Sequence, residues 1–311
     1  MYAKFHAIIL SRFGSSLQVR DHYHVIKRLG QGTFGQVLLV QDKLSGYPFA
    51  MKLLRKDKTN FRAFLKEVFI ATSLSGYSDV ITTFPIYNIT DDYYVMVQEL
   101  APAGTLHDLI YSKAGISEAA LKRCATQLSW ALDYMHSRGL VHRDLKPDNV
   151  LLMDKDCYNI KLSDFGLTEN VGTLVFAMSH IIPYMSPELC ALQDQDCLIL
   201  HGSVDSWAFG ILLFEALTRV VPWSEAVMED PFYRNYIDWQ KSAFVIPPPF
   251  YWKGFTEEAL IMFNGFFSRD PLFRASILSV YRYVHSPWRI VGHREAKLTK
   301  EEEEEVDIVG T

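Results

Sequence analysis

Cysteine is scarce in this sequence, and it shows none of the spacings that bind metals or form redox pairs. Four cysteines occur among 311 residues, and no two of them are separated as C-x-x-C. A chain of this length can bury a core large enough to fold without disulfides. We therefore predict that all four are reduced thiols, namely Cys124, Cys157, Cys190 and Cys197.

Long apolar runs are also missing. Runs such as Ala7–Leu10 and Leu174–Met178 are far shorter than the ~20 residues that a membrane helix requires. The first of them is also too short for the apolar region of a secretory signal. The sequence therefore predicts no membrane span and a location in the cytosol or nucleus, of which we take the cytoplasm as our prediction.

An excess of basic residues is absent as well. The formal net charge is −5, and residues 295–311 alone, with seven acids and two lysines, account for −5. The rest of the chain is therefore neutral overall, whereas proteins that bind nucleic acid through surface charge are usually strongly basic. We expect no nucleic-acid partner. The acidic block Glu301–Glu305 repels itself, which favours an extended tail that either aids solubility or binds a basic partner.

What the sequence does contain is enough apolar material for a large folded protein. Apolar residues make up 49% of the chain and charged residues 22%, which excludes disordered, collagen-like and low-complexity proteins. Its 311 residues also exceed the ~100–200 of an average domain. We therefore expect one large domain or two coupled lobes.

The first third of the chain alternates apolar or β-branched runs with turn residues, which is typical of antiparallel strands. Apolar residues at helical spacing over Phe61–Leu74 predict one helix, which ends before Gly76. The break Pro102-Ala103-Gly104 ends this region. The predicted strands are Tyr23–Leu29, Gln36–Gln41, Tyr47–Leu54, Ile86–Asn88 and Tyr93–Leu100.

The remainder of the chain is predicted to be mainly helical. Ser117 is a suitable N-cap, and apolar residues then recur at helical spacing until Gly139. Further helices are predicted over Ser203–Leu217, Thr256–Phe267 and Ala275–Val284.

The stretch Gly30-Gln31-Gly32-Thr33-Phe34-Gly35 matches G-x-G-x-x-G. A dinucleotide site would need a helix after the glycines and an acid ~20 residues later. Here a strand follows and Lys52 stands in place of the acid. Glycines between two paired strands allow a flap whose N–H groups face phosphate oxygens, although an ordinary structural hairpin is the alternative interpretation.

The most specific signal is His142-Arg143-Asp144-Leu145-Lys146-Pro147-Asp148-Asn149, with Asp164-Phe165-Gly166 following twenty residues after Asp144. Together these stretches resemble the catalytic loop and the metal-binding motif of eukaryotic protein kinases. The glycine loop and Lys52 precede them in the family's order, and chance agreement of this kind is negligible.

Later parts of the chain agree with this resemblance, which extends over about residues 23–285. Ser186-Pro187-Glu188 is similar to the family's A-P-E, and Arg274 is similar to the late arginine that pairs with its glutamate. Asp205–Gly210 is similar to the D-x-W-x-x-G helix. Short segments are most similar to the Src-homology-3-domain-binding serine/threonine kinases, at Ala101–Gly104, Lys122–Cys124, Gln127–Leu128 and Ile182–Tyr184.

The resemblance implies a bilobal α+β fold, with an antiparallel sheet and one helix in the N-terminal lobe and a mainly helical C-terminal lobe. It implies an N-terminal extension over residues 1–22, a kinase domain over 23–288 and an acidic tail over 289–311. Within that domain the boundary between the lobes (23–101 and 102–288) falls at the Pro-Ala-Gly break.

The resemblance also implies transfer of phosphate from ATP and gives roles to the motif residues. Asp144 would accept the proton of the substrate hydroxyl, and Lys146 would face the transferred phosphate. Asn149 and Asp164 would supply oxygen ligands to Mg²⁺. Lys52 would hold the α- and β-phosphates.

Further assignments concern the nucleotide site. Glu67 is the only acid in the predicted helix Phe61–Leu74, so it is the carboxylate that would orient Lys52. His142 is expected to brace the backbone rather than to exchange protons. By resemblance the nucleotide would contact Leu29, Gly30, Gly32, Phe34, Gly35, Val37, Ala50, Gln98, Glu99, Ala101 and Leu151.

The position of Lys146, two residues after Asp144, favours serine and threonine over tyrosine as phosphate acceptors. Lipid and small-molecule kinases share the catalytic-loop pattern but usually lack the A-P-E and D-x-W-x-x-G elements, so a protein substrate is predicted. The similar kinases are named for binding Src-homology-3 domains through proline-rich segments. This chain has Pro247-Pro248-Pro249 but no P-x-x-P, which gives little support for such a partner.

The activation segment between Phe165 and Glu188 departs from the family pattern. His180-Ile181 stand where active serine/threonine kinases usually carry Gly-Thr, and isoleucine cannot form the hydrogen bond of that threonine. The alternative to an active kinase is therefore a weakly active or inactive nucleotide-binding scaffold. Because the segment contains no Lys or Arg, we predict that it orders by apolar packing of Leu174–Met178 and without phosphorylation.

Overall fold

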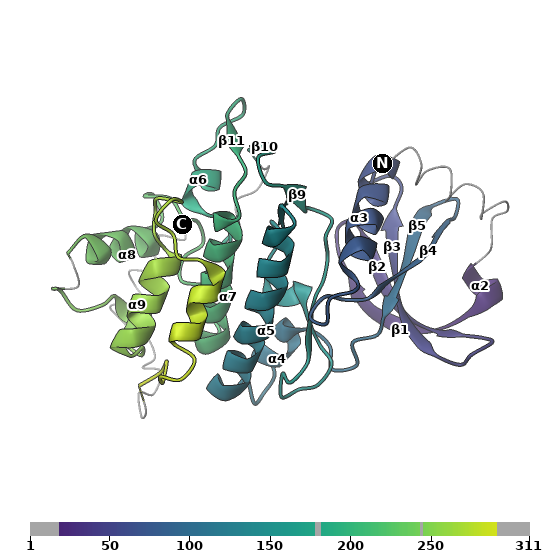
Figure 1. Cartoon of the computed structure of the whole chain (residues 1–311), viewed down its shortest axis with the longest axis horizontal. Coiled ribbons are helices and arrows are strands. Elements are labelled where there is room, and N and C mark those ends of the chain that lie inside the picture. The colour runs from purple at the N-terminus through teal and green to yellow at the C-terminus, as the bar shows by residue number, and fades with distance from the viewer. Residues whose placement is uncertain (1–18, 178–181, 243–244, 291–311) are drawn as a thin grey trace, which may run out of the picture. The chain divides into compact units, whose positions relative to one another are not determined.

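Figure 1 shows the computed structural model of the chain, which describes residues 19–177, 182–242 and 245–290. Its contacts divide the chain into two compact units. Of the described residues, unit 1 holds those from Val19 to Gly115 together with Gln127–Thr173, and unit 2 holds Ile116–Thr126 together with those from Leu174 to Ile290. The lobe boundary at residues 101–102 is a different division, and it stays a prediction.

Unit 1 contains the antiparallel sheet that the sequence predicts. Its five strands are hydrogen-bonded in the order β1-β2-β3-β5-β4, and every neighbouring pair is antiparallel. The strands are β1 (Tyr23–Gln31), β2 (Gly35–Asp42), β3 (Pro48–Arg55), β4 (Thr83–Ile89) and β5 (Tyr93–Glu99), and the short helix α2 (Val19–His22) precedes them. Strand β4 starts earlier than predicted, because Thr83 pairs with Gln98 across the sheet.

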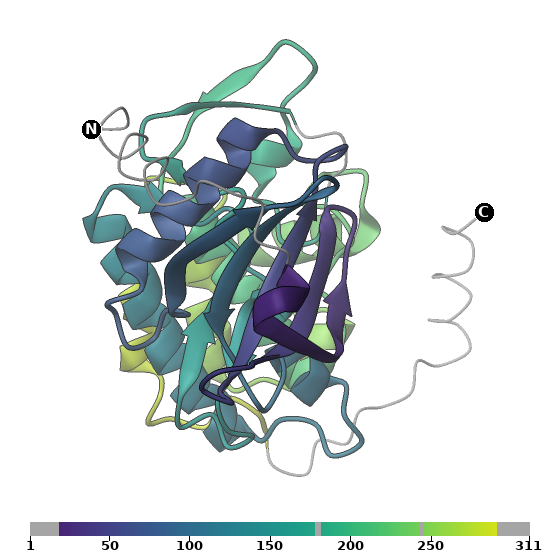
Figure 2. The same ribbon diagram turned by 90° about the vertical axis from the view of Figure 1, so that its right-hand side faces the viewer.

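Helix α3 (Phe61–Leu74) has the predicted bounds and lies beside the sheet in Figure 2. Its first turn is fixed by Asn60, whose side-chain oxygen accepts a hydrogen bond from the N–H of Ala63 at 2.8 Å. Its apolar face packs on the strands, and the ring of Phe64 stacks on Tyr94 with centroids 4.9 Å apart. The buried cluster between helix and sheet consists of Leu54, Phe64, Val68 and Met96.

The rest of unit 1 is built from short elements that fix two loops. These elements are α4 (Leu106–Ile110), β6 (Leu140–Val141), the 3₁₀ turn η1 (Pro147–Asn149), β7 (Val150–Leu152), β8 (Ile160–Leu162) and β9 (Glu169–Asn170). β6 pairs with β9 and β7 pairs with β8, both antiparallel. These pairings bring residues 142–149 next to residues 163–168.

Helix α5 (Glu118–Ser137) contributes residues to both units and confirms the helix predicted after Ser117. The hydroxyl of Ser117 accepts a hydrogen bond from the N–H of Ala120 at 3.2 Å, as expected of an N-cap. The predicted apolar positions are fully buried, at Leu121, Cys124, Ala125, Leu128, Ala131, Leu132 and Met135.

Unit 2 is organised around helix α7 (Ser203–Thr218), in which every residue from Ser203 to Ala216 is buried. The helix predicted over Thr256–Phe267 is confirmed as α9 (Glu257–Phe266), whereas the one predicted over Ala275–Val284 is a shorter 3₁₀ turn, η3 (Ile277–Arg282). The remaining elements are α6 (Pro187–Cys190), α8 (Pro231–Lys241), the 3₁₀ turn η2 (Phe250–Trp252), and strands β10 (Leu174–Phe176) and β11 (Cys197–Ile199).

Strand β10 corrects the prediction that Leu174–Met178 packs as a buried run. In the antiparallel pair of β10 and β11, only Val175 is buried, while Leu174 and Phe176 are 54% and 59% exposed. The reason is the alternation of side chains along a strand, which turns neighbouring residues to opposite faces of a two-stranded sheet. Met178 lies outside the described residues.

The chain thus has an α+β fold, with an N-terminal antiparallel sheet and a helical part, as predicted. Among the residues that the structure describes, no helix is both long and apolar enough to cross a membrane.

Candidate active site

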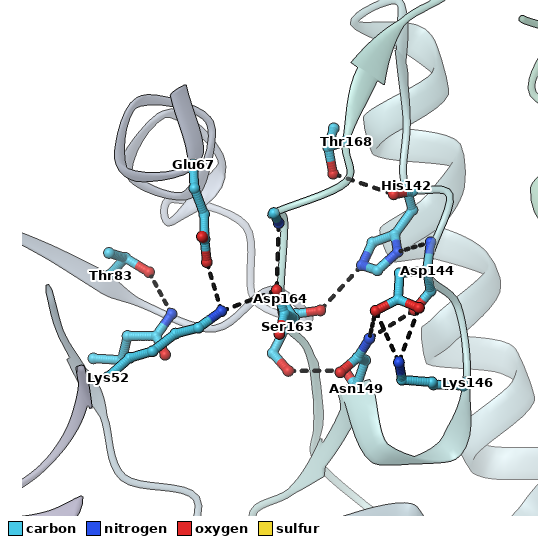
Figure 3. A network of polar contacts seen from close by, with 12 residues as sticks. Lys52, Glu67, Thr83, His142, Asp144, Lys146, Asn149, Ser163, Asp164 and Thr168 are labelled. Atoms are coloured by element: carbon cyan, nitrogen blue, oxygen red, sulfur yellow. Dashed lines mark hydrogen bonds and ion pairs between the residues drawn. The ribbon is translucent and has the colours of Figure 1, made fainter. Parts of the chain in front are cut away.

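Three charged side chains from separate elements of unit 1 meet beside the sheet (Figure 3). Nζ of Lys52, on β3, lies 2.7 Å from Oε1 of Glu67 on α3 and 3.0 Å from Oδ1 of Asp164, which follows β8. The contact expected between Lys52 and Glu67 is therefore present. It depends on the packing of α3 against β4 and β5, because that packing sets the distance between helix and strand.

The pKa values of this triad are shifted by opposing causes. Burial lowers the pKa of Lys52, but the carboxylates of Glu67 and Asp164 outweigh it and raise that pKa above its ordinary value. Burial raises the pKa of Glu67, and Lys52 only partly offsets this. For Asp164 burial also raises the pKa, but the attraction of Lys52 is larger and the pKa falls below its ordinary value. Lys52 and Asp164 therefore stay charged at neutral pH.

Asp144 lies in the loop between β6 and η1, and two donors hold its carboxylate (Figure 3). Nζ of Lys146 lies 2.9 and 3.0 Å from the two carboxylate oxygens. The amide nitrogen of Asn149 donates to Oδ2 of Asp144 at 2.9 Å and to its backbone oxygen at 2.7 Å. The turn η1 makes this possible, because it folds Asn149 back toward the residue five positions earlier.

The buried ring of His142 links this loop to the strand end that carries Asp164. The N–H of Asp144 donates to Nδ1 of His142 at 3.2 Å, and Nε2 lies 3.0 Å from the backbone oxygen of Ser163. Because Nδ1 accepts, Nε2 carries the proton and donates. Both ring nitrogens are thus occupied by backbone groups, which is the bracing arrangement predicted for His142.

Ser163 has no recognisable motif, and the sequence analysis missed it. Its N–H and its hydroxyl both donate to the backbone oxygen of Asn149, at 2.9 and 3.0 Å. Ser163 also accepts a hydrogen bond from His142. It therefore connects two residues of the catalytic loop, His142 and Asn149, to Asp164, the next residue in the chain. Its place directly before the Asp-Phe-Gly motif was the only available signal.

Two residues of the candidate site have left-handed backbone angles that only glycine adopts without cost. Arg143 has φ of 70° and Asp164 has φ of 63°. Strain of this kind persists only where surrounding contacts hold it, and it is common at active sites. Arg143 is held in part by a hydrogen bond from its Nη1 to the backbone oxygen of Leu167 at 3.3 Å.

The glycine loop forms the connection between β1 and β2. The N–H of Gly32 donates to the backbone oxygen of Gly35 at 2.9 Å, and Phe34 is exposed between them. A Cβ added to Gly35 would lie 1.9 Å from the backbone oxygen of Leu53, so a side chain there would clash with β3. No heavy atom lies within 4 Å of a Cβ added to Gly30 or Gly32, so only Gly35 is required for packing.

The other candidate nucleotide-binding residues also lie in unit 1. Val37 of β2 pairs with Lys52, and Ala50 of β3 pairs with Gln98 of β5. Leu29 lies on β1 and is partly exposed, and Glu99 ends β5. Leu151 lies on β7, where the neighbouring Leu152 exchanges backbone hydrogen bonds with residues 103 and 104, just after Ala101.

The side chains of Gln98 and Glu99 are already engaged. Gln98 donates to the hydroxyl of Thr83 at 3.0 Å. Glu99 accepts from the N–H of Thr82 at 2.7 Å and forms an ion pair with Lys161 at 3.2 Å. The amide nitrogen of Gln98 and the carboxylate of Glu99 are therefore already committed to protein partners.

The side-chain oxygens of Asn149 and Asp164 suit a hard metal cation. The amide nitrogen of Asn149 is committed to Asp144, so its side-chain oxygen is the atom that it would offer to a metal. Asp164 is charged and keeps 39% of its side chain exposed. An amide oxygen and a carboxylate, completed by water and phosphate oxygens, are ligands that suit Mg²⁺.

In unit 2 the expected pairing of Arg274 with Glu188 is confirmed. Nη1 and Nη2 of Arg274 lie 2.7 and 2.8 Å from the two carboxylate oxygens of Glu188. Nη1 also donates to the backbone oxygen of Ser203, the first residue of α7. This bidentate pair fixes α6 on the core of unit 2. His180 and Ile181, for which a lost hydrogen bond was predicted, lie outside the described residues.

Comparisons with known proteins agree with this arrangement. The family profile "Protein kinase domain" matches residues 23–288. Serine/threonine-protein kinase SBK1 of Danio rerio is 41% identical over 297 residues, which cover 94% of this chain and 77% of that protein. SBK1 of Mus musculus is 43% identical over 267 residues, covering 86% and 64%. Serine/threonine-protein kinase SBK2 of Homo sapiens is 38% identical over 274 residues, covering 88% and 79%.

Proposed function

The chain belongs to the protein kinase family, and we propose that it is a serine/threonine protein kinase that transfers the γ-phosphate of ATP to hydroxyl groups of proteins. The observation that carries this proposal is the pair of charge clusters in unit 1, Lys52–Glu67–Asp164 and Asp144–Lys146–Asn149. Phosphoryl transfer requires little covalent chemistry from a protein, and these clusters provide what it does require, which is positioning and charge.

In this mechanism Asp144 orients the attacking serine or threonine oxygen and accepts its proton. Lys146, already in contact with Asp144, places a positive charge beside the group being transferred. Lys52 holds the α- and β-phosphates, and Glu67 keeps its ammonium group aimed at them. Asn149 and Asp164 are the residues that would hold Mg²⁺, which would further neutralise the charge of the phosphates.

The nearest alternative is a kinase-like scaffold that binds nucleotide with little turnover. The predicted loss of a hydrogen bond at Ile181 motivates this alternative, whereas retention of Lys52, Asp144, Asn149 and Asp164 favours transfer. Both proteins would bind nucleotide, so binding alone does not separate them.

The decisive experiment measures phosphate transfer by the purified chain to an array of serine-, threonine- and tyrosine-containing peptides with Mg²⁺ and ATP. We expect labelling of serine or threonine peptides. Asp144→Asn should abolish transfer and spare nucleotide affinity, while Asp133→Asn, an exposed acid on α5, serves as the matched control. Nucleotide binding without any transfer would favour the scaffold, and an equal loss of affinity in Asp144→Asn would contradict the role of that residue.

Three further features complete the proposal. We expect a cytoplasmic protein and a basic partner or a solubility role for the acidic tail, while the lack of P-x-x-P gives little support for a Src-homology-3 partner. Replacing Ile181 with threonine should raise turnover if the missing hydroxyl limits activity. A slower but folded Ile181→Thr enzyme would contradict that explanation.

A further inference from the structure

A second ion pair connects helix α3 to the chain that follows the Asp-Phe-Gly motif. Lys66 of α3 pairs through Nζ with Oε1 of Glu169, the first residue of β9. The two side chains are 27% and 28% exposed. Lys66 directly precedes Glu67, so two consecutive residues of α3 bind two different partners, Glu169 and Lys52.

Glu169 is itself fixed to the catalytic loop. It lies opposite Val141 in the pairing of β9 with β6, and Val141 directly precedes His142. The hydroxyl of Thr168 donates to the backbone oxygen of His142 at 3.4 Å, and Val171 donates through its N–H to Gly139 at 2.8 Å. A side-chain hydrogen bond before Glu169 and a backbone hydrogen bond after it therefore hold it against the strand that leads to Asp144.

The two ion pairs of α3 bind the two ends of one short stretch. Asp164, which pairs with Lys52, begins it, and Glu169, which pairs with Lys66, lies five residues later. Between them Gly166 approaches α3 closely, since a Cβ there would lie 3.4 Å from Oε2 of Glu67. Ion pairs thus connect both ends of residues 164–169 to α3, through Lys52 and Glu67 at one end and Lys66 at the other. The same stretch is hydrogen-bonded to the catalytic loop.

We propose that Lys66 and Glu169 are positioning residues for phosphoryl transfer, which hold α3 against the catalytic loop so that Glu67 keeps Lys52 aimed. This inference rests on the proposed kinase function. Lys52 and Glu67 meet only while α3 stays in place, because each comes from a different element. The partly exposed pair contributes little to global stability, so its effect lies in selecting the position of the helix.

The same contact explains how the segment can order without a phosphate. Lys66 is a cation of α3 that a phosphate on the segment could bind, and the carboxylate of Glu169 already occupies it. Residues 165–188 contain no Lys or Arg that could take its place. Thr168 is fully buried and donates to His142, so its phosphorylation would require this part of the segment to open.

The test compares the steady-state kinetics of Lys66→Glu, Glu169→Lys and the charge-exchanged double variant, with Arg62→Ala as the control. Arg62 is an exposed cation one turn earlier on α3. We expect each single variant to lower kcat roughly tenfold and to raise the KM for ATP. The double variant should recover most of the loss, because it restores opposite charges, whereas Arg62→Ala should match wild type.

Hydrogen exchange of the α3 amides provides a readout that does not depend on activity. Residues 61–74 should exchange faster in Glu169→Gln than in wild type, while the amides of α7 stay unchanged. If wild type transfers no phosphate, the proposed function fails, but faster exchange in Glu169→Gln would still support the positioning role. Unchanged exchange, single variants as active as Arg62→Ala, or a double variant no better than either single would each overturn the inference.

Discussion

The two units differ in how their buried polar groups are arranged. In unit 1 the buried side chains of Lys52, Glu67 and His142 each contact a charged or backbone partner. In unit 2, within the part of the chain that the structure describes, the buried polar atoms without a hydrogen-bond partner gather in one aromatic cluster, apart from Oγ of Ser186. These atoms are the indole nitrogens of Trp207 and Trp223 and the hydroxyls of Tyr233 and Tyr236.

The aromatic cluster of unit 2 is centred on Trp223. Its ring centroid lies 5.6 Å from that of Trp207, 5.1 Å from Tyr233 and 5.4 Å from Tyr236. Burial raises the pKa of Tyr233 to about 12, and it raises that of Tyr236 further. Apolar area therefore stabilises this cluster, whereas in unit 1 specific partners determine where each group lies. The contacts of unit 1 thus fix the positions of individual polar groups, whereas the aromatic cluster of unit 2 mainly stabilises the fold.

The largest expected effect is on catalysis in unit 1. Lys52→Met should lower turnover, measured as kcat, at least ~10²-fold, because it removes a preorganised charge from the phosphate site. Phosphate transfer at saturating substrate measures this effect. A Lys52→Met protein with wild-type turnover would contradict both its assigned role and the distinction between the units.

The next effect is on stability in unit 2. Glu188→Gln should reduce the free energy of unfolding by ~3–5 kcal/mol, because it leaves the guanidinium of Arg274, which is 0% exposed, without its counter-charge. Urea unfolding measures the change. As a control, Lys241→Met removes an exposed pair with Asp238 and should change stability by less than ~1 kcal/mol. Similar losses in the two variants would show that the Glu188 pair gains nothing from burial.

A smaller effect on stability is expected when a buried hydroxyl is removed, and it should depend on whether that hydroxyl has a hydrogen-bond partner. Ser163→Ala should cost ~1 kcal/mol, because its hydroxyl donates to Asn149 at 3.0 Å. Tyr236→Phe should be neutral or slightly stabilising, because the deleted hydroxyl is buried without a partner. Thermal unfolding of both variants is the measurement. A clear loss of stability in Tyr236→Phe would mean that this hydroxyl has a partner in solution.

The smallest effect concerns pH. Burial raises the pKa of Glu118, but hydrogen bonds from Lys122 and from the N–H groups of Trp288 and Arg289 outweigh it and lower the pKa below 4.5. Ionised Glu118 therefore contributes stability that is complete above pH 4.5 and is lost as the pH falls through its folded pKa. Glu118→Gln should be less stable at pH 7, because the neutral amide loses the contacts that favour the ionised carboxylate.

The pH dependence supplies the control for that prediction. The difference between Glu118→Gln and wild type should shrink as the pH is lowered below 4.5, in a series of urea unfolding curves. A difference in stability that stays constant down to acid pH would show that the loss in Glu118→Gln does not come from the ionisation of Glu118.

Much of unit 1 could be predicted because its signals are local. The bounds of α3 follow from the spacing of apolar residues and the cap at Asn60, and the motif residues follow from contiguous stretches of sequence. The pairing of Lys66 with Glu169 could not be predicted in this way. The two residues are 103 positions apart, and no local pattern in either element depends on the other.

The errors in unit 2 have physical causes as well. Helix α8 was missed although Asp230 caps it and Pro231 begins it, because its mixed polar and aromatic residues weaken the periodicity. The exposure of Leu174 and Phe176 was not foreseen because an apolar run of five residues does not reveal how many faces its strand can bury. The acidic block Glu301–Glu305 and Ile181 both lie outside the described residues, so the predictions about them stand untested.

The two-stranded ribbon of β10 and β11 also contains a thiol that can be labelled selectively. Cys197 is exposed and lies opposite Phe176, whereas the other three cysteines are buried, and burial raises the pKa of Cys190 to about 11. Thiolates are the reactive form, so a maleimide dye should attach at Cys197 well before the buried positions. The native chain would then carry a single fluorophore on β11, beside strand β10 of the activation segment, and substrate or nucleotide binding could be followed by its emission without engineering any cysteine.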